Sequence, residues 1–324
     1  MGYHDSVTLL GRLSIVGAAP PPPGTPLHGA LARSRAERTF AVVCRNLRIP
    51  CPMESSILAR QLMARAQAAE ILGCLEAIPL KGLYLAHHLY PSPGLRDMGD
   101  LDLLIRRPTL RHADTELRRL GYVPEFEPER LAGGTLNAVE YWRDGCMPVH
   151  LHWHVSNASL PHFMYRIDVD EIWKDARGGV LAPHHLLVTL CEHALKHSFA
   201  ELIHLTDLEL ASRGVDWRLA ADTARRWGLE QAVHFALVLL RDLAGVESPG
   251  LDVFRATRVD WAGRAFLALA RGRRRNGISA LGFLSMTSQK LRFVREALAP
   301  PKTDGLRTRT LMGRLRGALR AITY

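Results

Sequence analysis

Two aspartates are the residues of this sequence whose type and spacing most clearly indicate chemistry. Asp100 and Asp102 stand two positions apart in a run that ends in Leu103-Leu104-Ile105, so a strand would direct both carboxylates to one face. Two neighbouring anions repel each other unless a cation compensates them. Mg²⁺ prefers such oxygen ligands and also binds phosphates, so the pair indicates metal-assisted phosphate chemistry. The alternative is that both aspartates merely cap helices or end strands.

Three histidines form the second group of chemically capable residues. His150, His152 and His154 alternate along one apolar segment, so a strand would place the three imidazoles on the same face. A His-x-His pair on a strand can bind a transition metal, and imidazole also takes up protons near neutral pH. If this strand lies near the aspartate strand, His150 and His152 reach Asp100 and Asp102. The alternative, which we favour for His154, is a half-exposed polar side chain on a sheet.

The elements that must position these residues can be predicted from hydrophobic spacing and from glycine and proline. Up to residue 160 we expect helices at 57–76, 83–90 and 109–120, and strands at 78–80, 96–105, 139–142 and 148–155, the last two joined by a turn at Asp144-Gly145. Beyond residue 160 we expect only helices, at 183–199, 202–212, 217–227 and 229–244. The predicted fold class is α+β: a small mixed β-sheet with flanking helices, followed by an all-α C-terminal domain.

These patterns divide the chain into four parts. Residues 1–30 contain Pro20-Pro21-Pro22-Pro23 and are expected to be a flexible, poorly packed segment. Residues 31–160 form the sheet domain with its N-terminal helices, and residues 161–250 form a helical domain. Residues 251–324 are expected to form a basic helical region, with a loop at Arg273-Arg274-Arg275.

Charge and cysteine content limit the class of protein further. The net charge is +10, and residues 255–324 contain 16 Lys and Arg against three Asp and Glu. Such a region could attract nucleic acid, an anionic surface or an acidic partner, although a solvated arginine-rich face is the simpler interpretation. The five cysteines are scattered and form no Cys-x-x-Cys pair, which is typical of a reducing compartment. With no apolar run long enough for a membrane span and no secretory signal, a cytoplasmic location is expected.

The motifs of the chain, taken in order, resemble a known family. They are Lys81-Gly82, Arg96, Gly99-Asp100-Leu101-Asp102-Leu103-Leu104-Ile105, Leu120-Gly121-Tyr122, Val149-His150-Leu151-His152-Trp153, Leu190-Cys191-Glu192-His193-Ala194-Leu195-Lys196-His197 and Leu205-Thr206-Asp207-Leu208. In this order and spacing they are similar to the poorly characterised bacterial nucleotidyltransferase family of the DNA polymerase β-like superfamily. The resemblance covers roughly residues 55 to 250 and implies a nucleotidyltransferase fold for the sheet domain.

The resemblance also implies roles for individual residues. In the superfamily a Gly-Ser turn holds the nucleotide phosphates, and Lys81-Gly82 stands at that position here. Asp100 and Asp102 match the superfamily's metal-binding pair, which a third carboxylate normally completes. His150 stands near the place of that third acid, and this departure leaves one metal, Mn²⁺ in place of Mg²⁺, or an altered third position all open.

Three further residues are expected to belong to the site. Arg96 would add positive charge near the phosphates, and His152 is a second candidate for the role of His150. Lys196 would line the nucleotide or acceptor cleft, or else belong to the contact between domains.

The function that this resemblance implies is metal-dependent transfer of a nucleoside monophosphate from a nucleoside triphosphate, such as ATP, to an acceptor. The acceptor would be a hydroxyl or phosphate of a small molecule, peptide or protein. Two other classes stay open. One is a degenerate member that binds a nucleotide or a partner without catalysis. The other is a nucleic-acid-binding protein that uses its basic C-terminal region, although we see no aromatic stacking platform interleaved with the basic residues there.

Overall fold

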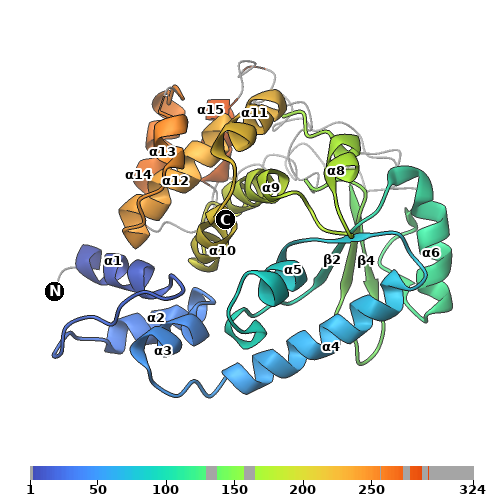
Figure 1. Ribbon diagram of the computed structural model, residues 1–324, viewed down its shortest axis with the longest axis horizontal. Coiled ribbons are helices and arrows are strands. Elements are labelled where there is room, and N and C mark those ends of the chain that lie inside the picture. The colour runs from blue at the N-terminus through green and yellow to red at the C-terminus, as the bar shows by residue number, and fades with distance from the viewer. Residues whose placement is uncertain are drawn as a thin grey trace, which may run out of the picture.

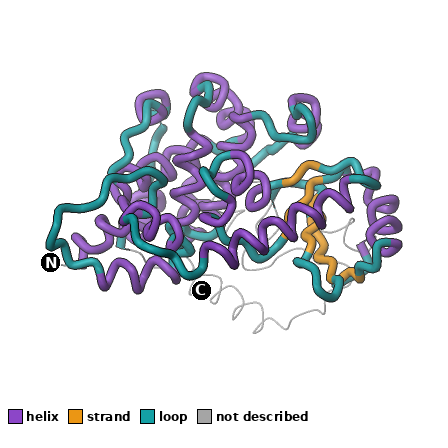
Figure 2. The backbone as a smooth tube through the Cα atoms, turned by 60° about the horizontal axis from the view of Figure 1, so that its bottom comes forward, coloured by secondary structure: helices purple, strands orange, loops and turns teal. Residues whose placement is uncertain are grey.

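The chain combines a small mixed sheet with many helices, as the computed structural model shows (Figure 1). The structure describes residues 3–128, 137–156, 165–255, 257–272, 278–286 and 291. The strands gather at one end of the molecule, and helices occupy the rest (Figure 2). The predicted α+β class is therefore confirmed. The basic segment that follows residue 291, and the predicted loop at Arg273-Arg274-Arg275, lie outside the described residues.

Five short strands form the sheet in the order β1-β2-β5-β4-β3. Strands β2 and β5 are parallel, and the other three neighbouring pairs are antiparallel. The strands are β1 (Ile78–Pro79), β2 (Leu101–Leu104), β3 (Val123–Pro124), β4 (Ala138–Trp142) and β5 (Val149–His152). The helices of this part are α4 (Glu54–Leu72), α5 (Lys81–His88) and α6 (Leu110–Arg119), with single 3₁₀ turns η1 (Pro93–Leu95) and η2 (Arg107–Thr109).

The two faces of the sheet differ in chemistry because side chains alternate along each strand. One face is apolar and forms a buried core with α4 and α6; its strand residues are Leu101, Leu103, Val139, Tyr141, Val149 and Leu151. The residues between them, Asp102, Glu140, His150 and His152, therefore share the opposite face, toward α9 (Figure 1). One sheet thus contributes to the core with one face and presents its ionisable groups on the other.

Helices make up the described part of the chain beyond residue 165. They are α8 (Val169–Asp175), α9 (Pro183–Lys196), α10 (Ile203–Ser212), α11 (Trp217–Trp227), α12 (Glu230–Ala244), α13 (Gly250–Val253), α14 (Trp261–Arg271) and α15 (Ser279–Met286). Their apolar faces form one large core, to which α12 contributes along nearly its whole length.

Three N-terminal helices complete the fold: α1 (Tyr3–Leu13), α2 (His28–Ala36) and α3 (Phe40–Leu47). The expectation of a poorly packed segment over residues 1–30 is wrong for α1, because Leu10 and Leu13 are buried in the helical core. Gly11 explains the packing: a Cβ there would lie 1.9 Å from the carbonyl oxygen of Leu243, so only glycine lets α1 approach α12 this closely.

Most predicted elements of the central region are confirmed to within a few residues. The helix predicted at 217–227 coincides with α11, and the strands at 139–142 and 148–155 pair as β4 and β5 around a turn in which Gly145 has φ of +73°. The strand predicted at 96–105 is reduced to β2, since residues 96–100 follow η1 as bends and irregular chain. Strand β3 and helix α8 were not predicted. Among the described residues, none of the helices is long and apolar enough to cross a membrane.

A buried ion pair connects the strand-bearing part to the helical part. The Arg96 guanidinium, just before β2, donates from Nε and Nη2 to the two carboxylate oxygens of Asp207 on α10, at 2.8 and 2.7 Å. The Tyr90 hydroxyl donates to the same carboxylate at 2.7 Å. Burial opposes the charge on Arg96, but Asp207 outweighs this effect and raises the pKa of the guanidinium. The same burial, together with Asp207, raises the pKa of Tyr90.

We expect removal of one partner of this pair to destabilise the protein strongly. Asp207→Leu would leave the buried Arg96 charge without compensation, at a cost of about 3–5 kcal/mol in the free energy of unfolding. The double variant Arg96→Met, Asp207→Leu should cost no more than the single one, because no isolated charge remains. Urea denaturation measures both, with Asp222→Leu, in an exposed pair with Arg225, as the near-neutral control. The single variant Arg96→Met is measured as well. A double variant whose loss of unfolding free energy equals the sum of the losses in Asp207→Leu and Arg96→Met would contradict this account.

Candidate active site

The register of β2, β5 and β4 brings the ionisable residues of the sheet together. In the parallel pair, Asp102 lies opposite His150, and His152 lies opposite Leu104 two positions further on. In the antiparallel pair, Glu140 lies opposite His150. Because opposite residues of neighbouring strands share a face, Asp102, His150 and Glu140 form a row across the sheet.

Asp102 is a buried carboxylate with a partner for each oxygen. His152 Nε2 donates to its Oδ1 at 2.7 Å, and the Lys81 ammonium lies 3.5 Å from its Oδ2. Burial alone raises the pKa of the Asp102 carboxyl, but the Lys81 charge and the His152 hydrogen bond reverse this effect and hold the pKa well below its usual range. His152 is itself buried, which lowers its pKa and keeps the imidazole neutral. Asp102 is therefore an anion at neutral pH even without a metal.

His150 lies between carboxylates on two sides. Its Nδ1 is 3.4 Å from Asp100 Oδ2 and 3.8 Å from Asp102 Oδ1, and its Nε2 is 3.1 Å from Glu140 Oε1. If Nε2 carries the proton and donates to Glu140, Nδ1 directs its lone pair toward the two aspartates. Glu140 was not among the predicted site residues. The predicted hairpin around Asp144-Gly145 held the signal, since its register pairs Glu140 with His150.

Lys81 and Gly82 form the first residues of α5 and lie beside this row. Lys81 has a φ of +45°, a left-handed conformation that is uncommon outside glycine and recurs at functional sites. A Cβ on Gly82 would lie 3.0 Å from Arg96 Nη1 and 3.2 Å from Met98 Cβ, so glycine allows close packing there. The turn thus holds the Lys81 ammonium over Asp102.

The structure assigns different surroundings to the remaining predicted residues. Arg96 lines the same cavity, but its guanidinium is taken up by Asp207. Lys196 lines the cavity as well, whereas its neighbour Glu192 is buried and accepts hydrogen bonds from Ser156 and Tyr165. His154 is not among the residues that line the cavity, and its Nδ1 bonds to the backbone of Ser156.

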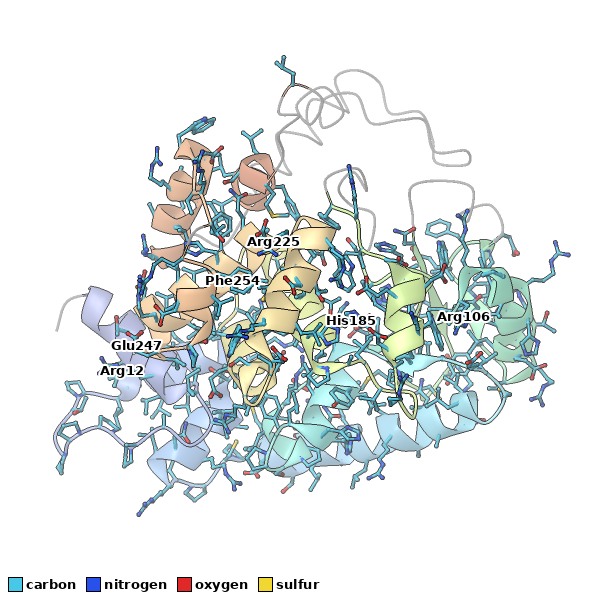
Figure 3. All side chains as sticks on the ribbon, turned by 45° about the horizontal axis from the view of Figure 1, so that its top comes forward. Arg12, Arg106, His185, Arg225, Glu247 and Phe254 are labelled. Atoms are coloured by element: carbon cyan, nitrogen blue, oxygen red, sulfur yellow. The ribbon has the colours of Figure 1, made fainter. Side chains whose placement is uncertain are left out.

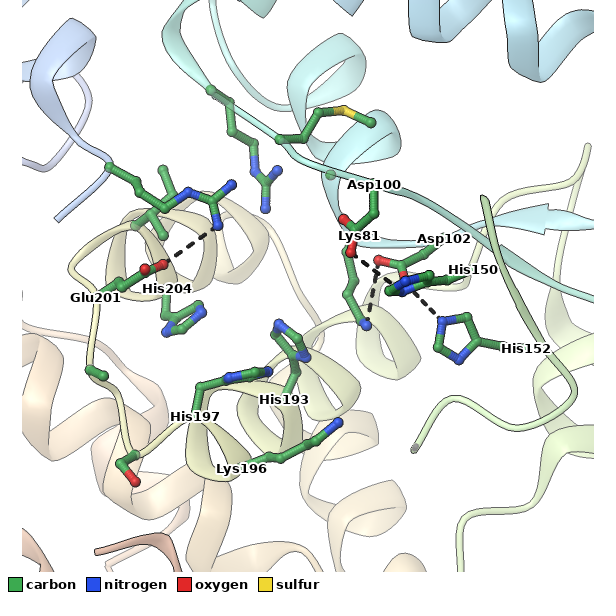
Figure 4. A pocket seen from close by; sticks show the side chains of 17 residues that line it. Lys81, Asp100, Asp102, His150, His152, His193, Lys196, His197, Glu201 and His204 are labelled. Atoms are coloured by element: carbon green, nitrogen blue, oxygen red, sulfur yellow. Dashed lines mark hydrogen bonds and ion pairs between the residues drawn. The ribbon is translucent and has the colours of Figure 1, made fainter. Parts of the chain in front are cut away.

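These side chains surround a cavity of about 590 Å³ between the sheet and the helical part (Figure 4). That volume lies in the range of small-molecule binding sites. One wall carries Lys81 with the aspartates and histidines at β2 and β5, and the other is formed by α9, α10 and a loop of the N-terminal helices. The lining residues are Arg38, Lys81, Gly82, Arg96, Met98, Asp100, Asp102, His150, His152, His193, Lys196, His197, Ser198, Ala200, Glu201, Ile203 and His204.

The donor atoms at the sheet wall fit one divalent cation. Within the described part of the chain, Asp102, His150 and His152 have ligand atoms within 4.8 Å of one another, and Asp100 Oδ2 lies close to the same His150 nitrogen. Two carboxylates and one imidazole suit Mn²⁺ well and Mg²⁺ less well, because Mg²⁺ favours oxygen. His152 is better placed to orient Asp102 than to ligate, since its Nε2 already bonds to that carboxylate.

Comparison with known proteins agrees with this geometry. The sequence profile of a family described as uncharacterised nucleotidyltransferases matches residues 51–245. The chain belongs to this family. The match includes the whole sheet, both aspartates and helices α9 to α12. Neither a curated protein nor a solved structure shows a significant match.

We expect the stability of the protein to fall as the pH drops below about 6.5. Burial is the largest cause that lowers the pKa of seven histidines, which are His87, His152, His184, His185, His193, His197 and His234. The unfolded chain then binds more protons below its ordinary histidine pKa of about 6.5. The contribution of these neutral histidines to the free energy of unfolding is complete above that pH. It is lost as the pH falls toward the lowered pKa values of the folded protein. Urea midpoints between pH 7.5 and 5.5 measure this loss.

His185, in the helical part of the molecule (Figure 3), offers a test for a single residue. Its ring is fully buried and stacks on Trp227 with centroids 5.0 Å apart. His185→Gln should flatten the pH dependence by up to about 1.4 kcal/mol per pH unit, the effect of one proton. The same substitution at the exposed His28 is the matched control. An unchanged slope in His185→Gln would refute the buried, neutral state of this ring.

Proposed function

We propose that the protein is a metal-dependent nucleotidyltransferase of the DNA polymerase β-like type, which transfers a nucleoside monophosphate from a nucleoside triphosphate to an acceptor. The observation that carries this proposal is the convergence of Asp100, Asp102 and His150 at the wall of one cavity, beside the Lys81-Gly82 turn. The family membership of the chain supports the same reaction class.

Lys81 and the first turn of α5 are the proposed binding site for the triphosphate. The amides at a helix N-terminus point toward a bound anion, and the lysine ammonium adds a point charge. Lys81 lies 3.5 Å from Asp102, so phosphates bound by it would also adjoin the carboxylates. Arg96 would help to fix the position of the turn, because its Nε and Nη2 are bonded to Asp207 and its Nη1 packs against Gly82.

Asp100, Asp102 and His150 are the proposed metal ligands, with Mg²⁺ or Mn²⁺ as the ion. When bound, the ion supplies positive charge that neutralises the phosphates and the developing negative charge of the leaving pyrophosphate. Glu140 would hold the proton on His150 Nε2 and so keep Nδ1 available, as carboxylates commonly do for metal-binding histidines. His152 would hold Asp102 in place through its hydrogen bond.

The reaction that these groups support is an in-line displacement. An acceptor hydroxyl oxygen forms a bond to the α-phosphorus, the bond to the bridging β-phosphate oxygen breaks, and pyrophosphate leaves. The acceptor hydroxyl loses its proton to solvent water in this step. Rate enhancement would come from positioning and from charge neutralisation.

A second candidate function is nucleotide binding without catalysis. Asp102 already has Lys81 and His152 as partners, so the fold does not require a metal to tolerate this carboxylate. The histidine at the third position brings no negative charge. Incubation with each labelled nucleoside triphosphate, Mg²⁺ or Mn²⁺ and a host extract separates the two functions. Label transferred to an acceptor supports catalysis, whereas saturable binding without transfer supports the second candidate.

We expect Asp100→Asn to abolish metal-dependent nucleotide binding and to leave the fold intact. The Asp100 side chain is 43% exposed and contacts His150, so its loss should change the free energy of unfolding by less than about 0.5 kcal/mol. Thermal shift with a nucleoside triphosphate, with and without Mg²⁺, measures the binding. Asp97→Asn, at an exposed aspartate that bonds to Arg60, is the matched control. A full metal-dependent shift in Asp100→Asn would exclude Asp100 as a ligand.

We expect His150→Asp to change the metal preference from Mn²⁺ toward Mg²⁺. A third carboxylate supplies the oxygen ligand and the negative charge that Mg²⁺ favours over nitrogen. Titration of both ions into the parent protein and the variant, in the presence of ATP, compares the two affinities. Glu140→Gln should shift the preference much less, because Glu140 lies behind the imidazole. The same Mg²⁺/Mn²⁺ ratio in the parent and in His150→Asp would show that His150 does not touch the metal.

A further inference from the structure

The wall of the cavity that faces the aspartates is made of basic and imidazole side chains. His193 and Lys196 lie in the last turn of α9, His197 follows them directly, and His204 comes from α10 (Figure 4). Arg38, from the turn after α2, completes this wall. We call these five residues the basic wall.

The three histidines of the basic wall form one compact cluster. The centroids of the His193 and His197 rings are 4.6 Å apart, and His204 lies 5.5 and 5.7 Å from them. Because the rings come from different positions on two helices, their nitrogens and the Lys196 ammonium offer donors from several directions. This arrangement suits a group with three or four oxygens more than a planar one with two.

The positive charge of Lys196 in the basic wall is compensated only at longer range, by Glu192 and Asp102. In the described parts of the chain, no hydrogen bond or ion pair involves the Lys196 ammonium, and burial lowers its pKa. Glu192, one turn away, accepts hydrogen bonds from Ser156 and Tyr165, and its charge raises the pKa of Lys196 by less than burial lowers it. Glu201 lies 3.5 Å from Arg38 and compensates that side chain. A partly buried ammonium in such surroundings gains most from an anionic ligand.

A metal ion would fit the basic wall poorly, although three imidazoles can bind one. Burial lowers the pKa of His193 and of His197, and the charges of Lys81 and Lys196 lower both values further. The same positive charges would repel a metal cation, whereas an anion is attracted by all of them. The cluster is therefore better suited to bind an anion through imidazole N–H groups and the ammonium.

We propose that the basic wall binds a phosphate group of the acceptor, so that the substrate class of this enzyme is a phosphorylated molecule. This inference rests on the proposed nucleotidyl transfer. The triphosphate has its own site at Lys81 and the α5 N-terminus, on the aspartate side of the cavity. A second anion on the basic wall would place the acceptor opposite the α-phosphorus. In-line attack requires this opposed arrangement of nucleophile and leaving group.

The first experiment tests the phosphate site alone. Inorganic phosphate is titrated by calorimetry into the protein in EDTA, so that no metal-bound nucleotide takes part. We expect saturable binding, weakened at least tenfold in Lys196→Gln and in the double variant His193→Gln, His197→Gln. The control Lys174→Gln, at an exposed lysine of α8, should bind as the parent does. Equal binding in Lys196→Gln and the parent, or no binding at all, overturns the proposal.

The same titration has a second readout, the number of protons taken up, obtained from buffers of different ionisation enthalpy. A bound phosphate favours protonated imidazoles, so binding near pH 7 should take up protons, and the uptake should fall in the His193→Gln, His197→Gln variant. The charged groups that face these rings are Lys81 from α5, Lys196 from α9, Asp102 from β2 and Arg38. An uptake that is the same in the variant would contradict the role of the two rings.

The second experiment assigns the site to the acceptor. Phosphate is titrated into protein saturated with Mg²⁺ and a nucleoside triphosphate whose α,β-bridge is methylene, which blocks transfer. Binding of phosphate at unchanged affinity supports an acceptor site. Displacement of phosphate by the nucleotide overturns it, because the basic wall would then hold the triphosphate. If phosphate binds but no nucleotide does, the phosphate site stands and the proposed transferase function fails.

Discussion

The buried pair of Arg96 and Asp207 is the interaction on which the geometry of the cavity depends. The pair links Arg96, upstream of β2, to α10, and the Tyr90 hydroxyl donates a hydrogen bond to the same Asp207 carboxylate. Because α10 carries one part of the basic wall and β2 carries Asp102, this pair sets the distance between the two walls. Two buried charges cost desolvation energy, and a bidentate geometry with a third donor offsets it. Arg96, which was expected to add positive charge near the phosphates, thus has its Nε and Nη2 bonded to Asp207.

The charge of Asp102 is compensated within the protein itself. Two adjacent anions were expected to need a divalent cation, yet the chain supplies Lys81 and His152 to the more buried of the two. Asp102 is thus compatible with a stable fold without metal. Two other features support a metal. Asp100 is 43% exposed and has His150 as its neighbour, and the His150 Nδ1 lone pair points toward both aspartates when Nε2 carries the proton. A site that is charged and accessible before its ion arrives is preorganised for binding.

The sequence was sufficient for features that depend on local patterns, and insufficient for those that depend on register and packing. Alternation places Asp102 apart from Leu101 and Leu103, and the Asp144-Gly145 turn indicates the hairpin, so both could be predicted. Glu140 was not predicted, because the turn indicates which two strands pair, whereas the contact of Glu140 with His150 also requires their exact register. The packing of α1 depends on the close approach of Gly11 to the backbone of α12. The ion-pair partner of Arg96 lies 111 residues away along the chain. Neither leaves a local signal.

The two walls of the cavity differ in sign, and this difference limits what can bind between them. Asp100 and Asp102 on one side favour a cation, whereas Lys196 and the histidine cluster on the other favour an anion. In the proposed reaction a metal-bound triphosphate would match the first wall, with its cation at the carboxylates and its phosphates at Lys81. That ligand leaves Lys196 of the basic wall without a directly bonded anion, since Glu201 pairs with Arg38 and Glu192 accepts hydrogen bonds from Ser156 and Tyr165. A second, separate anion is the simplest ligand that completes the charge balance, and the acceptor is the molecule of the proposed reaction that can supply it.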